Sequence, residues 1–356
     1  MKLLIAGGGT GGHVFPALAV AREWLSRGAE REVVFVGTER GLEAKLVPQA
    51  GLPLEKIRSA GLKGVGGMRL VRNAALLLPA LWDSAAILRR HRFAAACGMG
   101  GYAAGPVMLT AVLHFLPTVI FEPNAEPGFT NRVLARLVSR VATANERAAE
   151  RLGPKAVVTG CPVRREFFDC PPREHRAPFR ILITGGSQGA LAINRAVVDA
   201  LDTLAVRKEE LSIVHQTGER DYNAVRTAYA RREFPAEVLP FLSNMPERFA
   251  QADLIVCRSG AITVAEVTAA ERSAIFIPFG AATDRHQLRN AELLERVGAA
   301  RLIREDELTP ERLASEIFAL LDQPGRLREM EQRARQWARP RAAEQIVDLI
   351  AEVARR

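Results

Sequence analysis

The sequence predicts an α/β protein built from two Rossmann-like, doubly wound domains that face a cleft. Three observations predict this fold class. Short strands rich in Val and Ile alternate with helical patterns, and they lack the polar–apolar alternation of a half-exposed sheet. A strand, a glycine loop and a helix start occur together twice, as KLLIAGGGTGGH from Lys2 and as RILITGGSQGA from Arg180. The length of 356 residues also suits two domains.

The expected strands of the first half begin with KLLIA at 2–6, which leads into the first glycine loop and a helix from about Phe15 to Arg27. The runs EVVFVG, TVIFE and VVTG follow as further strands. Residues 93–121 carry no formal charge over 29 residues and are long enough to span a bilayer. Glycines and prolines interrupt this stretch, so we expect a strand, a glycine turn, a helix and a strand, all buried in a soluble core.

The expected strands of the second half are RILITGG, LSIVHQTG, ADLIVCRSG and SAIFIPF, each followed by a plausible helix. Residues 162–179 are rich in proline and charge, lack periodicity and are expected to be a linker. The first domain would then span 1–161 and the second 180–340, while the last helix, 341–356, could pack back on the first domain. Ligands of such sheets bind at the carboxyl ends of the strands.

The net charge of +9 lies entirely in the first half, where residues 1–160 carry 20 Lys and Arg against 11 Asp and Glu. Its richest part, Lys63–Arg92, holds six cations around the apolar run LLLPALW and a single acid, Asp83. Two interpretations stay open, a solvated basic face and a docking patch for an anionic membrane. Nucleic acid is disfavoured as a partner because only 6% of the residues are aromatic.

The four cysteines have neither paired spacing nor neighbouring histidines, which predicts neither a zinc site nor a disulfide framework. No signal peptide is visible at the start. We therefore expect a reducing cytoplasm as the compartment. The sequence also contains no Asp-x-Asp and no His/Asp cluster with metal-ligand spacing, so no metal and no cofactor is expected.

The first glycine loop contains G-x-G-x-x-G, which is typical of dinucleotide binding. That interpretation needs an acid at the end of the second strand, where this chain has Gly37 and Thr38, with Glu39 only beyond them. His13 directly follows Gly12, and a bare backbone at a helix N-terminus favours a nearby anion. His13 is therefore a candidate general base or phosphate ligand, although packing or capping is the commoner role of a lone histidine.

The second glycine loop, GGSQGA at 185–190, is a candidate anion cradle, although a simple strand-to-helix turn would also need these glycines. Further on, CRSGAITVAE places Glu266 early on a helix, where a carboxylate could accept hydrogen bonds from both hydroxyls of a ribose. After the next strand, Asp284, His286, Gln287 and Asn290 suit sugar hydroxyls. Without metal ligands, a leaving diphosphate would have to be stabilised by amides, a helix dipole and an arginine.

Seven segments, in order and over nearly the whole chain, give the sequence a specific resemblance to a known family. They are GGTGGHVFPALAVA, GMGGYAAGP, EPNAEPGFTNR, GCPVR, GGSQGA, CRSGAITVAE and DRHQLRNA. In these segments the chain resembles the lipid II-forming N-acetylglucosaminyltransferases of bacterial peptidoglycan synthesis, the MurG family. The resemblance implies a glycosyltransferase B-type fold and inverting, metal-independent transfer of GlcNAc from UDP-GlcNAc to the 4-hydroxyl of the muramoyl sugar of lipid I.

The resemblance also implies roles for single residues. In the second domain, the uracil would lie near the backbone of Leu242 and of Ala261, Ile262, Thr263 and Val264, with the ribose on Glu266. Ser187 and its helix would face the diphosphate with Arg164 nearby, and Gln287, with His286, would contact the GlcNAc hydroxyls. Thr10, Gly11, Gly12 and Asn124 would contact the sugar from the first domain, whose glycine loop and GMGGY turn could take the acceptor diphosphate.

For the general base, His13 is the first choice and Glu122 the second. The Lys63–Arg92 region would dock the enzyme on the cytoplasmic face of the membrane that carries lipid I. The chain departs from the family pattern at Phe121 and Pro123, where relatives often have His and Gln, and at His286, where some have Gln. Alternatives are another UDP-sugar enzyme of the same fold, such as a glycolipid glycosyltransferase or a UDP-GlcNAc 2-epimerase, a nicotinamide-dependent oxidoreductase, and a non-catalytic binding module.

Overall fold

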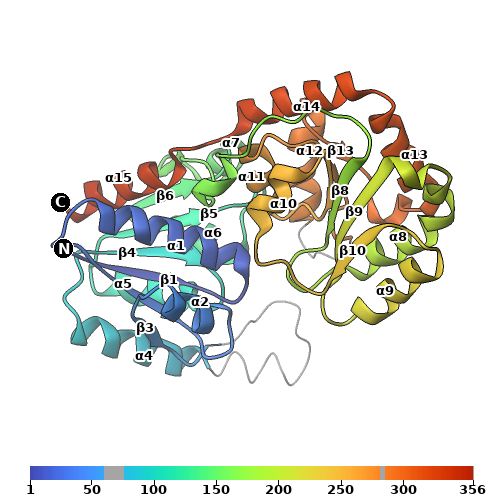
Figure 1. The fold of residues 1–356 in the computed structure, drawn as a ribbon. Helices are drawn as coiled ribbons and strands as arrows, with labels where there is room; N and C mark the ends of the chain where they lie inside the picture. The colour runs from blue at the N-terminus through green and yellow to red at the C-terminus, as the bar shows by residue number, and fades with distance from the viewer. Residues whose placement is uncertain (60–75, 281–284, 356) are drawn as a thin grey trace. The chain divides into compact units, whose positions relative to one another are not determined.

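The computed structural model describes residues 1–59, 76–280 and 285–355. The chain forms two compact units, one of Met1–Arg164 with Arg339–Arg356 and one of Arg165–Ala338. Each unit contains its own parallel sheet (Figure 1). Among the described residues, every recorded strand pair is parallel.

The first unit has a seven-stranded sheet of order β3-β2-β1-β4-β5-β6-β7. Its elements are β1 (Lys2–Gly7), α1 (Gly11–Ser26), β2 (Glu32–Gly37), α2 (Glu43–Gln49), β3 (Leu54–Lys56), α4 (Leu77–Arg90), β4 (Ala95–Gly100), α5 (Ala104–Leu113), β5 (Thr118–Glu122), α6 (Phe129–Leu134), β6 (Arg140–Thr143), α7 (Glu146–Leu152), β7 (Ala156–Val158) and α15 (Ala342–Ala354). The helix expected from Phe15 begins at Gly11, because the glycines of the loop already form its first turn.

Both faces of this sheet are covered by helices. On one face, Leu4 of β1 belongs to a buried cluster with Ile87 of α4 and Met108 of α5. On the other face, α15 packs against α1 and against β4, β5 and β6 (Figure 1). Arg27, the C-cap of α1, donates hydrogen bonds to Asp348 and to the carbonyl of Glu344. The last helix is thus part of the first unit.

The second unit has a six-stranded sheet of order β10-β9-β8-β11-β12-β13. Its elements are β8 (Phe179–Thr184), α8 (Leu191–Leu204), β9 (Leu211–Gln216), α9 (Tyr222–Arg231), β10 (Ala236–Leu239), α10 (Met245–Gln251), β11 (Leu254–Cys257), α11 (Ala261–Ala269), β12 (Ala274–Phe276), α12 (His286–Arg296), β13 (Arg301–Leu302), α13 (Pro310–Leu321) and α14 (Pro324–Trp337), with short 3-10 helices at Arg165–Phe167, Ala205–Glu210 and Glu305–Glu307.

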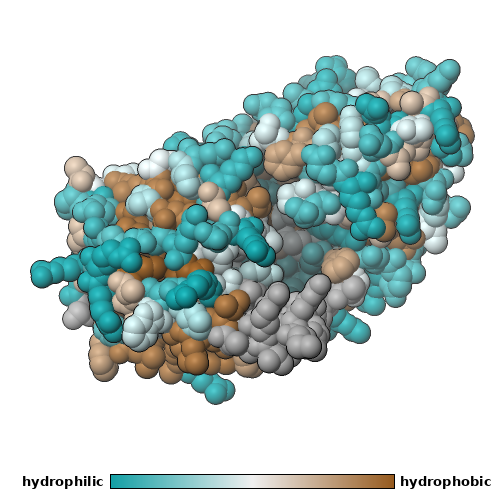
Figure 2. Space-filling model, turned by 90° about the horizontal axis from the view of Figure 1, so that it is seen from below, coloured by the Kyte–Doolittle hydropathy of each residue, from teal (hydrophilic) through white to brown (hydrophobic). Residues whose placement is uncertain are grey.

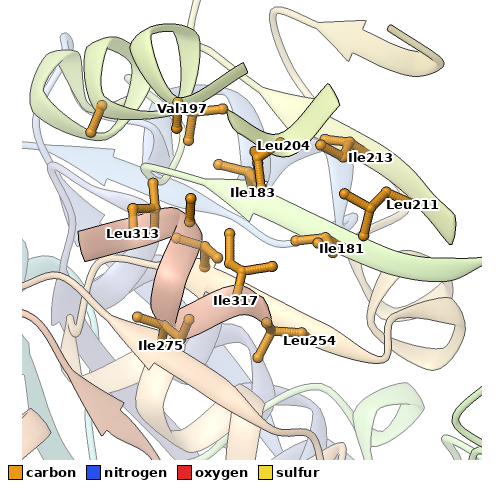
Figure 3. Close-up of a cluster of buried hydrophobic side chains, with 14 of the residues drawn as sticks. Ile181, Ile183, Val197, Leu204, Leu211, Ile213, Leu254, Ile275, Leu313 and Ile317 are labelled. Carbon is orange, nitrogen blue, oxygen red and sulfur yellow. The ribbon is translucent and has the colours of Figure 1, made fainter. Parts of the chain in front are cut away.

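The core of the second unit lies between its sheet and helices α8 and α13 (Figure 3). Ile181 and Ile183 of β8 point toward Val197 of α8 and Ile317 of α13. Apolar side chains such as these supply most of the free energy that holds a sheet and its helices together. This packing fixes the start of α8, and with it the glycine loop that precedes the helix.

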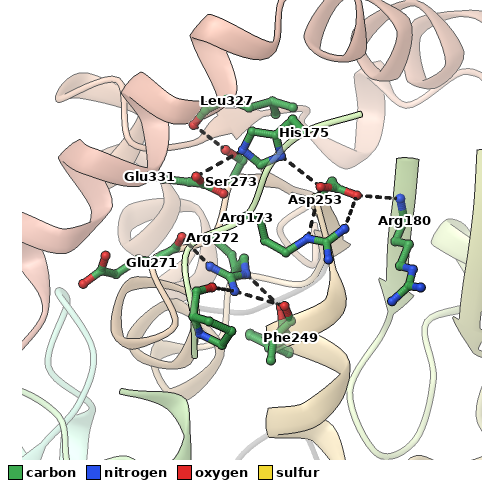
Figure 4. Close-up of polar contacts among 12 residues, drawn as sticks. Arg173, His175, Arg180, Phe249, Asp253, Glu271, Arg272, Ser273, Leu327 and Glu331 are labelled. Carbon is green, nitrogen blue, oxygen red and sulfur yellow. Dashed lines mark hydrogen bonds and ion pairs between the residues drawn. The ribbon is translucent and has the colours of Figure 1, made fainter. Parts of the chain in front are cut away.

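Most of the expected linker, 162–179, is packed into the second unit. His175 is held between two carboxylates, Asp253 (Nδ1 to Oδ1, 3.0 Å) and Glu331 (Nε2 to Oε2, 3.1 Å) (Figure 4). Arg173 donates to both oxygens of Asp253 at 3.3 and 3.1 Å, and the amide of Arg180 donates to Oδ2 at 2.8 Å. The chain enters the second unit at residue 165 because these contacts anchor the segment before β8 begins.

A second buried cation anchors the start of the same segment. Arg272 is almost completely buried and donates hydrogen bonds to the carbonyl oxygens of Pro171 (2.6 Å) and Phe249 (2.9 Å) (Figure 4). Proline-rich segments lack amide donors of their own, so a guanidinium that binds their carbonyl groups fixes them without regular structure. The absence of periodicity at 162–179 therefore indicated irregular backbone and not a free linker.

The uncharged stretch 93–121 folds as expected into β4, a glycine turn, α5 and β5. The expectation that all of it is buried was wrong, since Leu113 and Phe115 at the end of α5 are 64% and 93% exposed. None of the helices in the described part of the chain is both long enough and apolar enough to cross a membrane.

The strand order of each sheet reverses beside its first strand. β1 lies between β2 and β4, and β8 lies between β9 and β11. Open α/β sheets bind ligands at the carboxyl ends of the strands that flank such a reversal. The loops after β1 and β4, and the loops after β8 and β11, are therefore the positions at which each unit can bind a ligand.

Candidate functional site

The first glycine loop is in direct contact with the turn that follows β4. The amide of Gly8 donates to the carbonyl of Gly100 at 3.2 Å. A Cβ atom at Gly101 would lie 2.1 Å from the carbonyl oxygen of Gly8, and the φ of Gly101 is +83°. Only glycine fits there. The structure thus brings together the two loops that the sequence assigns to the acceptor.

The first turn of α1 leaves backbone donors for a ligand. Thr10 is its N-cap but makes no capping hydrogen bond with its side chain. The carbonyl of Thr10 accepts from the amides of His13 and Val14, so the amides of Gly11 and Gly12 have no partner within the helix. Such an N-terminus favours an anion or a hydroxyl oxygen nearby.

His13 projects from this turn as a neutral imidazole. Its Nδ1 lies 3.1 Å from the carbonyl oxygen of Met99, which can only accept, so Nδ1 carries the proton and Nε2 keeps its lone pair. Burial lowers the pKa of His13 below 6.5, against the opposing effects of the Met99 hydrogen bond and the charge of Glu43. His13 therefore has the protonation state of a general base at neutral pH.

Glu122, the second candidate base, is a buried carboxylate whose oxygens are occupied. Oε1 accepts from the amide and the side chain of Asn124, at 2.9 and 3.1 Å. Oε2 accepts from the amide of Gly128 at 3.0 Å and from the side chain of Asn131 at 2.8 Å. With four donors and 2% exposure, Glu122 orders the loop that carries Asn124. This arrangement favours His13 as the base.

The second glycine loop opens on a cavity of about 570 Å³. Its lining includes the loop glycines Gly185 and Gly189 and the start of α8. The side chain of Gln287 also lines it, and its Oε1 accepts from the amide of Phe279 at 2.9 Å, which leaves its amide group as a donor. Ser187 is exposed on the loop itself. This cavity combines the predicted diphosphate loop with one predicted sugar contact.

Gln216 connects this loop to Leu242, although the sequence analysis did not single it out. Its Nε2 donates to the carbonyl of Gly186 at 2.8 Å, and its Oε1 accepts from the amide of Leu242 at 3.0 Å. The amide of Leu242 is therefore occupied within the protein. Glu266 lies on the second turn of α11, whose first turn consists of Ala261–Val264.

The residues after β12 divide into two kinds. Asn290 is buried and donates to the carbonyl of Ser259 at 3.2 Å, so it joins α12 to the turn after β11. His286 begins α12 next to Gln287. Asp284 lies outside the described residues.

Arg164 and Phe121 both belong to the first unit. Arg164 is the last residue of the first segment of that unit, and its guanidinium stacks over the ring of Phe15 of α1 at 5.1 Å. Phe121 is 1% exposed in β5 and is part of the core.

Two arginines in the second cavity were missed by the sequence analysis. Arg258 follows β11, pairs with Glu305 at 2.7 Å and stacks over Phe279. Arg195, one turn into α8, lines the same cavity and makes no ion pair with any described residue. Arg258 stood inside the quoted motif CRSG, but nothing local to Arg195 signals its role. Both bring a guanidinium group to the cavity, which Glu305 also lines.

The dinucleotide interpretation of the first loop is not supported. Glu39, the acid that follows β2 most closely in the sequence, is exposed and pairs with Lys56 at 3.8 Å. A ribose-binding acid belongs at the carboxyl end of that strand, next to the glycine loop. The carboxylate that lies there, that of Glu43, is buried and accepts from the amides of Thr38 and Gly9.

The fold and the two loop sites define a glycosyltransferase with two Rossmann-like domains. Residues 3–143 match the glycosyltransferase family 28 N-terminal domain, and residues 180–346 match the family 28 C-terminal domain. The chain belongs to the MurG family of N-acetylglucosaminyltransferases. It is 48% identical over 360 residues to the UDP-N-acetylglucosamine–N-acetylmuramyl-(pentapeptide) pyrophosphoryl-undecaprenol N-acetylglucosamine transferase of Anaeromyxobacter sp. (strain Fw109-5), covering 100% of this chain and 94% of that protein.

Other relatives agree with this membership. The enzyme of the same name from Myxococcus xanthus (strain DK1622) is 46% identical, over 99% of this chain and 93% of its own. The crystal structure of Acinetobacter baumannii MurG matches 99% of both chains with a TM-score of 0.79 at 35% identity. UDP-GlcNAc 2-epimerase from Neisseria meningitidis, bound to UDP-GlcNAc, matches with a TM-score of 0.71 over 99% of this chain and 100% of its own. At 13% identity, that likeness concerns the fold alone.

Proposed function

We propose that this enzyme transfers GlcNAc from UDP-GlcNAc to the 4-hydroxyl of the muramoyl sugar of lipid I, with inversion and without a metal ion, forming lipid II and UDP. The observation that carries the proposal is the 48% identity, over the whole chain, to a transferase whose name states this donor and this acceptor. The sites in both units are consistent with that reaction.

The second unit would bind the donor. The diphosphate would lie at the start of α8, beside Ser187 and the glycines of the loop, with Arg195 and Arg258 as its cations. Gln287, with His286, would bind the GlcNAc hydroxyls, and Glu266 the ribose. The carbonyl of Leu242 and the first turn of α11 would contact the uracil. Two guanidinium groups and a helix N-terminus can stabilise the charge that develops on departing UDP.

The first unit would supply the base. Nε2 of His13 accepts the proton of the 4-hydroxyl while that oxygen forms its bond to the anomeric carbon of GlcNAc. The bond from the anomeric carbon to the diphosphate oxygen breaks, and its electron pair leaves with UDP. Attack from the face opposite the leaving group inverts the anomeric configuration. Thr10, Gly11, Gly12 and Asn124 would contact the sugars, and Arg164, which belongs to this unit, would contribute positive charge.

The enzyme would act at the cytoplasmic face of the membrane, held there by α4. Leu78 and Trp82 of this helix are 76% and 72% exposed, and Figure 2 shows apolar side chains gathered on the face of the first unit that carries α4. Arg89 and Arg90 are exposed at its end. Apolar side chains beside cations are the surface that an anionic lipid interface binds. Lys63, Arg69 and Arg72 of the predicted patch lie outside the described residues.

Replacing both Leu78 and Trp82 with alanine is expected to weaken binding to anionic vesicles by about 100-fold or more, since full burial of a large apolar side chain contributes about 1.5–3 kcal/mol. Co-sedimentation with vesicles measures this, and turnover of a short-chain soluble acceptor should not change. Val206, 83% exposed in the second unit, provides the matched control as Val206→Ala. Wild-type vesicle binding by the double variant would mean that α4 is an ordinary solvated surface.

The test of the reaction itself is transfer of labelled GlcNAc from UDP-GlcNAc to a short-chain lipid I analogue, with and without excess EDTA. We expect a β-linked product at equal rates in both conditions. Loss of transfer with EDTA, restored by Mg²⁺, would contradict the metal-independent mechanism. Conversion of UDP-GlcNAc to its 2-epimer without transfer would contradict the proposed acceptor reaction.

A further inference from the structure

A buried carboxylate lies beneath the first glycine loop and has no part in the roles described above. Glu43, the first residue of α2, is 1% exposed. Its Oε2 accepts from the amide of Gly9 at 2.6 Å, and its Oε1 accepts from the amide and the hydroxyl of Thr38, both at 2.9 Å. An ionised or polar group buried this deeply is stable only when its oxygens are hydrogen-bonded. Glu43 meets that condition entirely with loop donors.

Three glycines from separate segments leave the space for this carboxylate. A Cβ atom at Gly8, Gly37 or Gly41 would lie 2.2, 2.5 or 1.9 Å from the nearest atom of the Glu43 side chain. Gly8 belongs to the first glycine loop, Gly37 ends β2, and Gly41 precedes α2. The loops after β1 and β2 are thus shaped around one side chain.

The contact fixes the loop from two directions. The amide of Gly9 binds Glu43, and the carbonyl of Gly9 accepts from the amide of Leu42 at 3.3 Å. The amide of Gly9 is therefore committed to the protein itself, so an acceptor must use the amides of Gly11 and Gly12. His13 follows Gly9 by four residues. The negative charge of Glu43 favours the protonated form of His13, whereas burial disfavours it.

We propose that Glu43 is a positioning residue for His13, which fixes the glycine loop and, through it, the place from which the imidazole accepts the proton of the acceptor hydroxyl. This inference rests on the proposed function, because it assumes that His13 is the base. Glu43 itself touches no substrate, and its effect passes through Gly9 and through its charge.

Two variants separate the position of the carboxylate from its charge. Glu43→Gln removes the charge and places an amide donor against a loop donor, and Glu43→Asp keeps the charge but draws the carboxylate back by one methylene. We expect kcat to fall about 10- to 100-fold in both, because small displacements of a reacting group cost about that much. The KM for UDP-GlcNAc should change less than kcat, since the uracil, ribose and diphosphate of the donor bind to the second unit.

The pH profile of the reaction distinguishes this role from a purely structural one, which would leave the profile unchanged. In Glu43→Gln, the acid limb of kcat/KM should move to lower pH, because His13 loses a charge that favours its protonated form. In Glu43→Asp, the acid limb should stay at its wild-type position. Asp253→Asn is the matched control, since Asp253 is an equally buried, hydrogen-bonded carboxylate in the other unit. It should lower the unfolding temperature and leave kcat and the pH profile unchanged.

Wild-type kcat in either Glu43 variant, or a lowered kcat in Glu43→Gln with an unshifted acid limb, would overturn the role of Glu43. If Glu43→Gln does not fold, wild-type kcat in Glu43→Asp overturns it on its own. The wild-type enzyme is assayed in parallel. Absence of transfer by the wild type contradicts the proposed function, whereas equal transfer by the wild type and the variants contradicts only this inference.

Discussion

Replacing His13 with asparagine is expected to lower kcat for GlcNAc transfer by about 10³-fold, within the range that general-base catalysis supplies. Asparagine can still donate to the carbonyl of Met99, so the first turn of α1 should keep its conformation. What it lacks is the lone pair of Nε2. Steady-state transfer to a soluble acceptor measures kcat, and calorimetry with UDP-GlcNAc should give a wild-type Kd.

The matched variant for His13→Asn is Glu266→Ala, which we expect to change donor binding and not kcat. UDP-GlcNAc should bind about 10-fold more weakly, since a hydrogen-bonded charged group contributes about 1.5–3 kcal/mol, while kcat at saturating donor changes little. In the wild type, burial lowers the pKa of His13 below 6.5, so activity should fall only as the pH drops through that lowered pKa. An acid limb above pH 6.5, or a nearly active His13→Asn enzyme, would exclude His13 as the base.

Replacing Asp253 with asparagine is expected to reduce the free energy of unfolding of the second unit by about 3–5 kcal/mol. Asp253 is fully buried and accepts from Arg173, His175 and the amide of Arg180. Removing one member of a buried charge network leaves its partners uncompensated, which costs about that much. Urea unfolding followed by fluorescence and circular dichroism measures the change. A loss below 1 kcal/mol would show that the cluster in Figure 4 contributes little to stability.

The same cluster makes stability depend on pH. Burial alone would lower the pKa of His175, but hydrogen bonds to Asp253 and Glu331 outweigh burial and raise it to about 9. A raised pKa in the folded state means that the contribution is complete below pH 6.5 and is lost as the pH rises through about 9. The wild type should thus unfold more easily at pH 9.5 than at pH 6, and His175→Asn should shrink this difference.

Local patterns were enough to predict the architecture. β1, the glycine loop and α1 each occupy a short stretch whose apolar run, bare backbone and helical periodicity can be recognised without distant contacts. The same holds for β8 and α8 in the second unit. The repeat of this unit predicted two similar domains, and the strand order around β1 is the same as that around β8.

The parts that could not be predicted depend on contacts between distant residues. Glu43 lies 34 positions from Gly9, and nothing local to either residue indicates their contact. Arg195 lies on a helix whose sequence there shows only amphipathic periodicity. The segment before β8 appeared to be a linker because its partners, Asp253 and Glu331, are 78 and 156 residues from His175. A single sequence carries no local sign of such pairings.

The return of α15 to the first unit affects the order in which the protein can fold on the ribosome. Ile346, Val347 and Ile350 bury the apolar face of this helix, which packs against α1, β4, β5 and β6. N-terminal domains generally fold first during synthesis, but here the first sheet lacks part of its cover until α15 has been translated. A nascent chain stalled before residue 339 would therefore carry a finished second unit and an incomplete first one, with an exposed apolar sheet face that chaperones can bind.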